Sequence, residues 1–416
     1  MSRRAREIDV VVIGGGPAGL AAAASAAAAG ANVVLVDRNP QLGGILNQCI
    51  HDGFGLHAFG ELLTGPEFAA RSIESALQAG VEMHSDTLVA ELTPKRELIC
   101  TSTGTRYGLR ASSVVLAMGC RERTRGMLRI PGERPAGVYT AGTAQWLTNM
   151  ANVRVGRRIL VLGSGDIGLI MARRLTWEGA DVVGVVELLP YASGLPRNIT
   201  QCLEDYDIPL HLSHSVLCIH GRDRLEGVTV CRFDEQRRPI PGTAFDVACD
   251  TLLLSVGLIP ENEISRRAGV KLDRTTSGAY VDDRYMTNVP GIFSCGNVLH
   301  IHDLADWAAE EGSRAGRSAA AHALGRAAAV DLEQVRVEPG AGIRYVVPQT
   351  AARAARDLLL SFRVTEPDDH RTAEVLADGR VLAAQSLRHA HPATMVQMPI
   401  QCAGGFDAAR LEVRLL

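Results

Sequence analysis

Paired cysteines are missing from this sequence of 416 residues. Its nine cysteines, at positions 49, 100, 120, 202, 218, 231, 249, 295 and 402, include no CxxC pair. This spacing shows neither a disulfide framework nor the usual zinc and iron-sulfur ligand sets. We therefore expect no metal site and a reducing, cytoplasmic setting.

The sequence also lacks a large excess of charge of either sign and has few long apolar runs. The 43 basic residues nearly balance the 46 acidic ones, for a net charge of -3, and aromatic residues make up 4 %. This balance favours neither nucleic acid nor an anionic membrane as a partner. Glycines and a proline interrupt the apolar run near the N-terminus, which disfavours a secretory signal. No uninterrupted apolar span of about 20 residues occurs elsewhere, so no integral membrane segment is predicted.

A nucleotide-binding fingerprint is present at the start of the chain. Residues 9–13 (DVVVI) predict a strand, and Gly14, Gly16 and Gly19 follow in GxGxxG register before an alanine-rich helix and a second strand that ends at Asp37. The glycines permit a tight turn, close approach of a pyrophosphate, and close packing of helix on strand. The N-terminal end of the helix then favours the diphosphate, and we expect Asp37 to accept hydrogen bonds from a ribose.

The same pattern recurs in the middle of the chain. A strand is followed by Gly163, Gly165 and Gly168, a helix, and a second strand that ends at Glu187. Two such units predict two dinucleotide sites. The carboxylate of Glu187 would repel a 2′-phosphate, which favours NAD over NADP. A duplicated but empty fold is the alternative, because a fold does not guarantee occupancy.

Three later segments extend the α/β pattern. Two short buried strands, within residues 112–119 and 250–257, each stop at a glycine. Further on, a strand is followed by a Gly296-Asn297 turn and by a long alanine-rich helix that begins near Asp306.

The last part of the chain, residues 331–416, has a different pattern. Short runs such as LLLSFRVTE and ARLEVRLL are bounded by turn residues, Asp378-Gly379 among them. They predict a small all-β domain, a sandwich. We expect it to offer a docking surface for a partner subunit or a second copy of the chain, and support of the neighbouring domain is the alternative.

Over residues 7–326 these motifs together resemble the two-dinucleotide-binding-domain flavoproteins, the FAD-dependent pyridine nucleotide-disulfide oxidoreductase superfamily. The resemblance implies an α/β fold with two Rossmann-like nucleotide-binding domains, followed by the small C-terminal all-β domain. Residues 1–122 and 280–330 would form a discontinuous FAD-binding domain. Residues 123–279 would form an inserted NAD(P)-binding domain, and residues 331–416 the β domain.

The resemblance also implies cofactor contacts, with FAD on the first fingerprint and NAD(H) on the second. The implied contact residues are Gly14, Gly16, Pro17, Ala18, Gly19, Asp37, Arg38, Gly43, Gly44, Gly119, Gly163, Gly165, Asp166, Gly168, Glu187, Gly257, Gly296, Asn297 and Asp306. In the family the late turn reads Gly-Asp, whereas Asn297 brings no charge. The helix that begins near Asp306 would aim its N-terminal dipole at the flavin.

The redox-active cysteine pair of that superfamily is missing. The positions that resemble the glutathione reductase pair are Leu46 and His51, and those that resemble the thioredoxin reductase pair are Ala141 and Ala144. None of these side chains can exchange a disulfide. Cys49 is the lone thiol near the first site, and packing as a small hydrophobe is favoured over oxidation to a sulfenate.

The candidate catalytic residues are His51, Cys49 and His302. In the place of the superfamily's charge-transfer thiolate, the His51 imidazole would accept or donate a substrate proton. A histidine that ties down a glycine-rich loop is the alternative. His302 is a weaker candidate, and the His300-x-His302 pair without a third ligand makes a poor metal site.

Longer stretches, GGILNQCIHDGFGLHAFGELLTGPEFA and SCGNVLHIHDLADW among them, resemble the oxidoreductase subunit that accompanies glycerol-3-phosphate dehydrogenase and 2-hydroxyglutarate oxidase-like proteins, and subunits of opine and proline dehydrogenases. This implies a partner, either a second flavoprotein dehydrogenase subunit or another copy of the chain. We predict hydride or electron transfer between NAD(H) and that partner or a small hydroxy-acid or amine substrate, through FAD. The alternatives are a non-catalytic FAD-binding scaffold subunit and a disulfide reductase that uses Cys49.

Overall fold

The computed structural model describes residues 6–326, 333–402 and 404–416, and the chain divides into two compact units. Unit 1 consists of Met1–Cys120 and Pro260–Leu416, and unit 2 of Arg121–Ile259. The strands at the two points where the chain passes between units are β9 (Cys120–Glu122) and β18 (Leu258–Pro260). Each unit is described separately.

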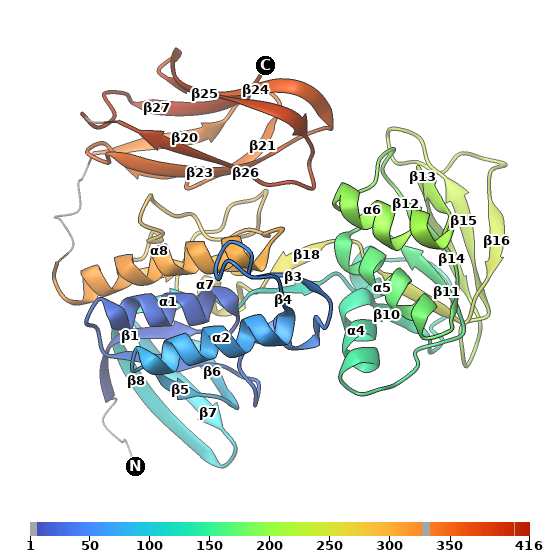
Figure 1. Ribbon diagram of the computed structural model, residues 1–416, viewed down its shortest axis with the longest axis horizontal. Coiled ribbons are helices and arrows are strands. Elements are labelled where there is room, and N and C mark those ends of the chain that lie inside the picture. The colour runs from blue at the N-terminus through green and yellow to red at the C-terminus, as the bar shows by residue number, and fades with distance from the viewer. Residues whose placement is uncertain (1–5, 327–332, 403) are drawn as a thin grey trace. The chain divides into compact units, whose positions relative to one another are not determined.

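A seven-stranded sheet forms the centre of unit 1 (Figure 1). Its order is β5-β2-β1-β8-β7-β6, and β19 pairs with the last residues of β8. The strand β2 and the last four residues of β1 are runs of valine, leucine and isoleucine that are buried throughout, as expected for covered parallel strands. The strand bounds are β1 (Arg6–Ile13), β2 (Val33–Val36), β5 (Glu82–His84), β6 (Thr87–Leu92), β7 (Glu97–Ser102), β8 (Thr105–Leu116) and β19 (Ile292–Ser294).

Two alanine-rich helices, α1 (Pro17–Ala28) and α8 (Ala305–Ala323), pack against each other in unit 1 (Figure 1). Glycines set the short distance between them. A Cβ on Gly312 would lie 2.1 Å from Ala18 O, and one on Gly316 would lie 2.1 Å from Ala22 O. The remaining elements of this part are η1 (Gly44–Gln48), β3 (Asp52–Phe54), β4 (Leu63–Thr64), α2 (Gly65–Gln78), α7 (Glu263–Arg267) and η3 (Gly296–Val298).

Unit 2 is built on a five-stranded parallel sheet of order β10-β17-β11-β12-β13, with a three-stranded antiparallel sheet β14-β15-β16. Its strands are β10 (Val138–Thr140), β11 (Arg158–Leu162), β12 (Asp181–Glu187), β13 (Leu210–Leu212), β14 (His214–His220), β15 (Gly227–Arg232), β16 (Phe245–Ala248) and β17 (Thr251–Leu254). Its helices are α3 (Arg125–Leu128), α4 (Ala141–Asn149), α5 (Asp166–Trp177), α6 (Pro196–Cys202) and η2 (Glu204–Tyr206).

The C-terminal part is all-β, which confirms that prediction. One sheet has the order β22-β20-β27-β24-β25 and the other β21-β23-β26, and both contribute to one apolar core that includes Phe362 and Val413. The strands are β20 (Gln334–Pro339), β21 (Ile343–Val347), β22 (Thr350–Ala352), β23 (Asp357–Val364), β24 (Asp368–Ala377), β25 (Arg380–Ala390), β26 (Val396–Gln401) and β27 (Arg410–Leu415). We refer to this part as the C-terminal sandwich.

The two compact units group the chain differently from the predicted domains in two places. Residues 260–279 belong to unit 1, because α7 contacts β6 and the Asn262 side chain donates to Val298 O at 2.9 Å. The C-terminal sandwich also belongs to unit 1. Gln349 accepts from Val281 N at 2.9 Å with its side chain and donates its own N–H to Val281 O at 3.1 Å.

No helix in the described part of the chain combines the length and the hydropathy needed to cross a bilayer.

Candidate functional site

The first fingerprint forms the turn from β1 into α1. Gly14 has a φ of +108°, and a Cβ there would lie 2.3 Å from Ala117 O at the end of β8. A Cβ on Gly19 would lie 1.8 Å from Gly14 O, so both positions require glycine. Around Gly16, no described atom lies within 4 Å of the place a Cβ would take. With Pro17 as the first helical residue and no acid in the first turn, the cradle fits a pyrophosphate.

Asp37 follows β2 and faces the fingerprint. Its carboxylate accepts from Gly15 N at 2.6 Å through one oxygen and from Asn39 N at 2.7 Å through the other. Each oxygen keeps further acceptor capacity, so a ribose hydroxyl is still a suitable partner. The next predicted contact residue, Arg38, makes no hydrogen bond of this kind to the described residues of the fingerprint. Its side chain is 63 % exposed, and its guanidinium lies 3.8 Å from Glu261.

The loop after β2 returns to the fingerprint. Gly43 N donates to Gly15 O at 2.7 Å, and a Cβ on Gly44 would lie 3.2 Å from Gly16 Cα. The loop that carries Cys49 and His51 therefore starts against the open side of the first cradle.

Asp306 anchors the far end of this loop. Its carboxylate accepts backbone N–H groups from Gly55 at 3.1 Å and from His57 and Ala58 at 3.0 Å each. The resemblance implied a direct cofactor contact here. Instead, the structure shows a buried carboxylate at the start of α8 that orders the loop, while the His57 ring stacks on Trp307 at 4.5 Å.

Cys49 has the environment of a structural thiol. Its Sγ lies 3.3 Å from Ile45 O, and its carbonyl accepts from Gly65 N at 2.9 Å. Burial raises the pKa of Cys49 to about 12, so the nucleophilic thiolate is scarce at neutral pH. This environment favours the packing interpretation of Cys49 over a catalytic role.

His51 lies beside Phe54, with 5.1 Å between the ring centroids. Its Nδ1 is 2.8 Å from Asp52 O, and a carbonyl can only accept, so Nδ1 carries a proton. In the neutral imidazole Nε2 is then the basic nitrogen. Both predicted roles, a loop tie and a proton acceptor, are consistent with this geometry because they use different ring atoms.

The Gly296-Asn297 turn lies beside the first helix. Gly296 has a φ of +71°, and a Cβ there would lie 2.6 Å from Ala18 Cβ. The carboxamide of Asn297 accepts from His302 N at 2.9 Å, and its Nδ2 is 3.7 Å from Cys120 Sγ. The turn is thus held next to the open cradle in the same unit.

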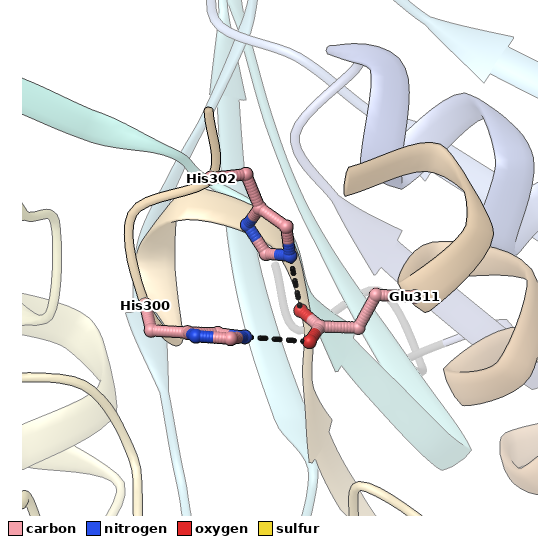
Figure 2. A group of neighbouring side chains, drawn as sticks. All are labelled: His300, His302 and Glu311. Atoms are coloured by element: carbon pink, nitrogen blue, oxygen red, sulfur yellow. Dashed lines mark hydrogen bonds and ion pairs between the residues drawn. The ribbon is translucent and has the colours of Figure 1, made fainter. Parts of the chain in front are cut away.

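His302 does not border an open site. Figure 2 shows its imidazole and that of His300 directed at the carboxylate of Glu311 on α8. The two Nε2 atoms lie 2.7 Å (His300) and 3.5 Å (His302) from the carboxylate oxygens, and all three side chains are at most 5 % exposed. We call these residues the buried triad. Its position corrects the expectation that His302 acts on a substrate.

The second fingerprint repeats the first in unit 2. Gly163 has a φ of +92°, and a Cβ there would lie 2.1 Å from Ser255 O, just after β17. A Cβ on Gly168 would lie 2.5 Å from Ser255 Cβ. Glu187 accepts from Ser164 N at 2.9 Å, the same relation that Asp37 has to the first fingerprint.

The glycines Gly119 and Gly257 end the strand segments predicted at 112–119 and 250–257. Both have positive φ angles, of +72° and +96°, and no described atom lies closer than 3.9 Å to a Cβ at either position. Like Gly16, they leave open space beside their fingerprints.

The second site differs from the first in its charges. Asp166 is the first residue of α5, and its carboxylate accepts from Leu195 N at 2.8 Å and Asn198 Nδ2 at 2.7 Å. The predicted contact residue thus fixes the start of α6. Glu187 also accepts from the hydroxyls of Ser164 at 2.6 Å and Ser193 at 3.0 Å. A pyrophosphate at the second site would meet the negative charge of Asp166 in the first turn of α5, whereas the first turn of α1 contains no acid.

Three of the four positions that resemble the superfamily's cysteine pairs are part of the core, and the fourth is the half-buried His51. Leu46 is 1 % exposed and packs with Phe68 and Ala309. Ala141 and Ala144 are fully buried in α4.

The pyridine nucleotide-disulphide oxidoreductase family model matches residues 8–312. This chain belongs to that family. Family membership supports FAD as the cofactor and an oxidoreductase fold around the two fingerprints.

The chain is also similar, at low sequence identity, to individual proteins. A hydrogen cyanide synthase subunit (HcnB) of Pseudomonas aeruginosa is 26 % identical, over 73 % of this chain and 67 % of its own. The small chain of glutamate synthase [NADPH] from Escherichia coli is also 26 % identical, over 74 % of this chain and 66 % of its own. Thioredoxin reductase of T. acidophilum has a TM-score of 0.63 at 23 % identity, covering 77 % of this chain and 99 % of that one, which confirms the predicted fold.

The most informative residue that the sequence analysis missed is Glu311. It lies nine residues beyond His302 on a helix predicted only as alanine-rich, so no local motif links it to the histidines. A helical register placing Glu311 on the buried face of α8 was the one available signal.

Proposed function

We propose that this chain is an FAD-dependent oxidoreductase that passes a hydride or electrons between NAD(H) and a partner flavoprotein or a small hydroxy-acid or amine substrate. The observation that supports it is the pair of matched glycine cradles, each with an acid oriented by a backbone N–H, in a chain whose cysteine-pair positions are Leu46, His51, Ala141 and Ala144. Without a dithiol, the flavin is the two-electron store.

The residues that would hold FAD are those around the first cradle: Gly14, Gly16, Ala18, Gly19, Asp37, Gly43, Gly44, Gly119 and Gly296. The bound flavin supplies hydride acceptance and release. His51 would move the substrate proton through Nε2, because its Nδ1–H is committed to Asp52 O. Asp306 would keep the His51 loop ordered at its far end.

A partner subunit is part of the proposal. The related hydrogen cyanide synthase chain is a subunit and the glutamate synthase chain a small chain, which supports a heteromeric setting. We infer the branch from the stretches that resemble the subunits beside glycerol-3-phosphate dehydrogenase and in opine and proline dehydrogenases. The nine cysteines are thiols, which fits a reducing cytoplasm.

The decisive experiment is anaerobic mixing of the purified chain with NADH while the flavin absorption is recorded. We expect a yellow protein whose flavin band bleaches. A flavin that NADH leaves oxidised but dithionite reduces would contradict the NAD(H) part of the proposal, and a colourless protein that takes up no FAD would contradict all of it.

Two matched variants locate the two cofactors. Gly16→Ala places a Cβ in the open first cradle, so we expect a folded protein without flavin. Gly165→Ala places a Cβ 3.0 Å from Ser255 Oγ, the mobile end of a side chain, so we expect a yellow protein that dithionite reduces and NADH does not.

The scaffold alternative is favoured by one observation, the charges at the second site. Asp166 is held at the start of α5, and Glu187 already accepts hydrogen bonds from two hydroxyls. A scaffold subunit would bind FAD, but NADH would not reduce it. The wild type would then be a yellow protein that dithionite reduces and NADH does not, the result that we expect of Gly165→Ala.

A further inference from the structure

The buried triad is the least explained cluster in the described part of the chain. Glu311 is 5 % exposed and lies inside unit 1, and no lysine or arginine of the described residues forms an ion pair with it. Burying a carboxylate is costly unless hydrogen bonds or a charge offset the lost hydration. The distances around it show which groups do so.

A metal ion does not fit the triad as it stands. Ligands of a tetrahedral Zn²⁺ at about 2.0–2.1 Å lie roughly 3.3 Å from one another. His300 Nε2 and Glu311 Oε2 are only 2.7 Å apart, which is a hydrogen-bond distance, and the three ligand atoms spread over up to 4.8 Å. Neither Nδ1 atom has a hydrogen-bond partner among the described residues, so the second-shell bonds that orient metal-binding histidines are missing too.

The triad is better described as a buried ionised carboxylate held between two imidazoles. Burial alone would raise the pKa of Glu311, but the two histidines hold that pKa below its ordinary value, so the carboxylate is ionised. Burial lowers the pKa of His300. Its Nε2 donates to the carboxylate, because an ionised carboxylate oxygen can only accept. The nearby Arg363 does not cancel the charge, because it is paired with Asp303.

A further hydrogen bond to this carboxylate connects the triad to the turn beside the first cradle. Gly296 N donates to Glu311 Oε1 at 2.7 Å. A charge-assisted bond of this kind is short and strong, and it fixes the turn whose next residue, Asn297, accepts from His302 N. Glu311 therefore contacts the Gly296-Asn297 turn directly, and His302 contacts it through the backbone.

We propose that Glu311 is a positioning residue for the flavin, and that its charge lowers the flavin's reduction potential. The inference rests on the proposed function. The Gly296 bond holds the turn against the cofactor, and the fixed anion opposes the extra negative charge that reduction brings. The positioning effect depends on the oxygen that accepts from Gly296 N, and the effect on the potential depends on the charge of the carboxylate. Substitutions can therefore separate the two effects.

Two substitutions make this separation. Glu311→Gln keeps an oxygen for Gly296 N and removes the charge, so we expect FAD affinity within about twofold of wild type and a more positive midpoint potential. Glu311→Asp keeps the charge and shortens the side chain, so we expect a potential close to wild type and an FAD affinity about tenfold weaker, as for loss of a charged hydrogen bond. The matched control is Glu310→Gln, since Glu310 is 42 % exposed and its ion-pair partner among the described residues is Arg314 on the same helix.

The measurements are FAD binding to apoprotein and the midpoint potential from dye equilibration, with thermal unfolding as a check on folding. An unchanged potential in Glu311→Gln, or the same change in Glu310→Gln, would overturn the role of the charge. If Glu311→Gln does not fold, unchanged FAD affinity in Glu311→Asp still overturns the positioning role. A wild type that binds no flavin defeats the proposed function and this inference together, whereas a flavin-loaded wild type with an unresponsive potential defeats the inference alone.

Discussion

Removal of one buried guanidinium should loosen the C-terminal sandwich from the segment that follows the Gly296-Asn297 turn. Arg363 on β23 is paired with Asp303 and donates to Ile301 O at 3.0 Å and Tyr345 Oη at 3.2 Å. Asp303 in turn accepts from Met395 N at 2.6 Å. The paired side chains are 11 % and 13 % exposed, so solvent screens them little.

Breaking such a pair by removing one partner costs about 3–5 kcal/mol, because the remaining charge is left buried and unpaired. We therefore expect Arg363→Met to lower the melting temperature of unit 1 by roughly 5–10 °C, given the unfolding entropy of a unit of this size. Asp303→Asn should cost a similar amount.

The assay is calorimetry on both single variants and on Arg363→Met/Asp303→Asn. The double variant should lose less than the sum of the two singles, by an interaction energy of about 1–3 kcal/mol. Losses that simply add, or a single-variant shift below about 2 °C, would refute the claim that this pair joins the sandwich to residues 300–303.

Three further predictions test other parts of the structure. Burial raises the pKa of Asp282 to about 6, so the stability that its protonated carboxyl contributes is complete below the unfolded pKa near 4 and is lost as pH rises through 6. Asp282→Asn keeps Oδ1 for two backbone N–H groups. Denaturant unfolding should show this variant to be more stable than wild type by on the order of 2–3 kcal/mol at pH 8 and equal to it at pH 4. Native Cys49, with a thiolate fraction of about one in ten thousand at pH 8, should resist iodoacetamide for hours, and rapid labelling at that residue with loss of activity would favour the disulfide reductase alternative. Gly19→Ala, whose Cβ would overlap Gly14 O, should not fold, in contrast to Gly16→Ala, and circular dichroism separates the two.

Much of the fold was predictable, because local patterns specify it. The valine-rich β1, the glycines that need positive φ or close approach, and the acid at the end of the second strand all lie within about 25 residues of one another. The C-terminal sandwich followed from short runs between turns. The boundary near residue 260 was missed because α7 joins unit 1 through contacts distant in sequence.

The candidate site was less predictable, because the same residue types serve structure and chemistry. Asp306 accepts hydrogen bonds from a loop and Asp166 from the start of α6, and sequence spacing reveals neither partner. His302 was a weaker candidate for a catalytic residue, and its side chain contacts Glu311, since the side chains of residues 300 and 302 both turn inward. In each case the side chain's partner, and not its position in the sequence, decides its role.

The central claim is that the flavin is the only two-electron store in this polypeptide, and a reductive titration tests it directly. Anaerobic addition of dithionite to the FAD-loaded chain should complete bleaching at two electrons per flavin. Uptake of four electrons per flavin, with two thiols newly titratable afterwards, would reveal a redox-active disulfide and contradict the account.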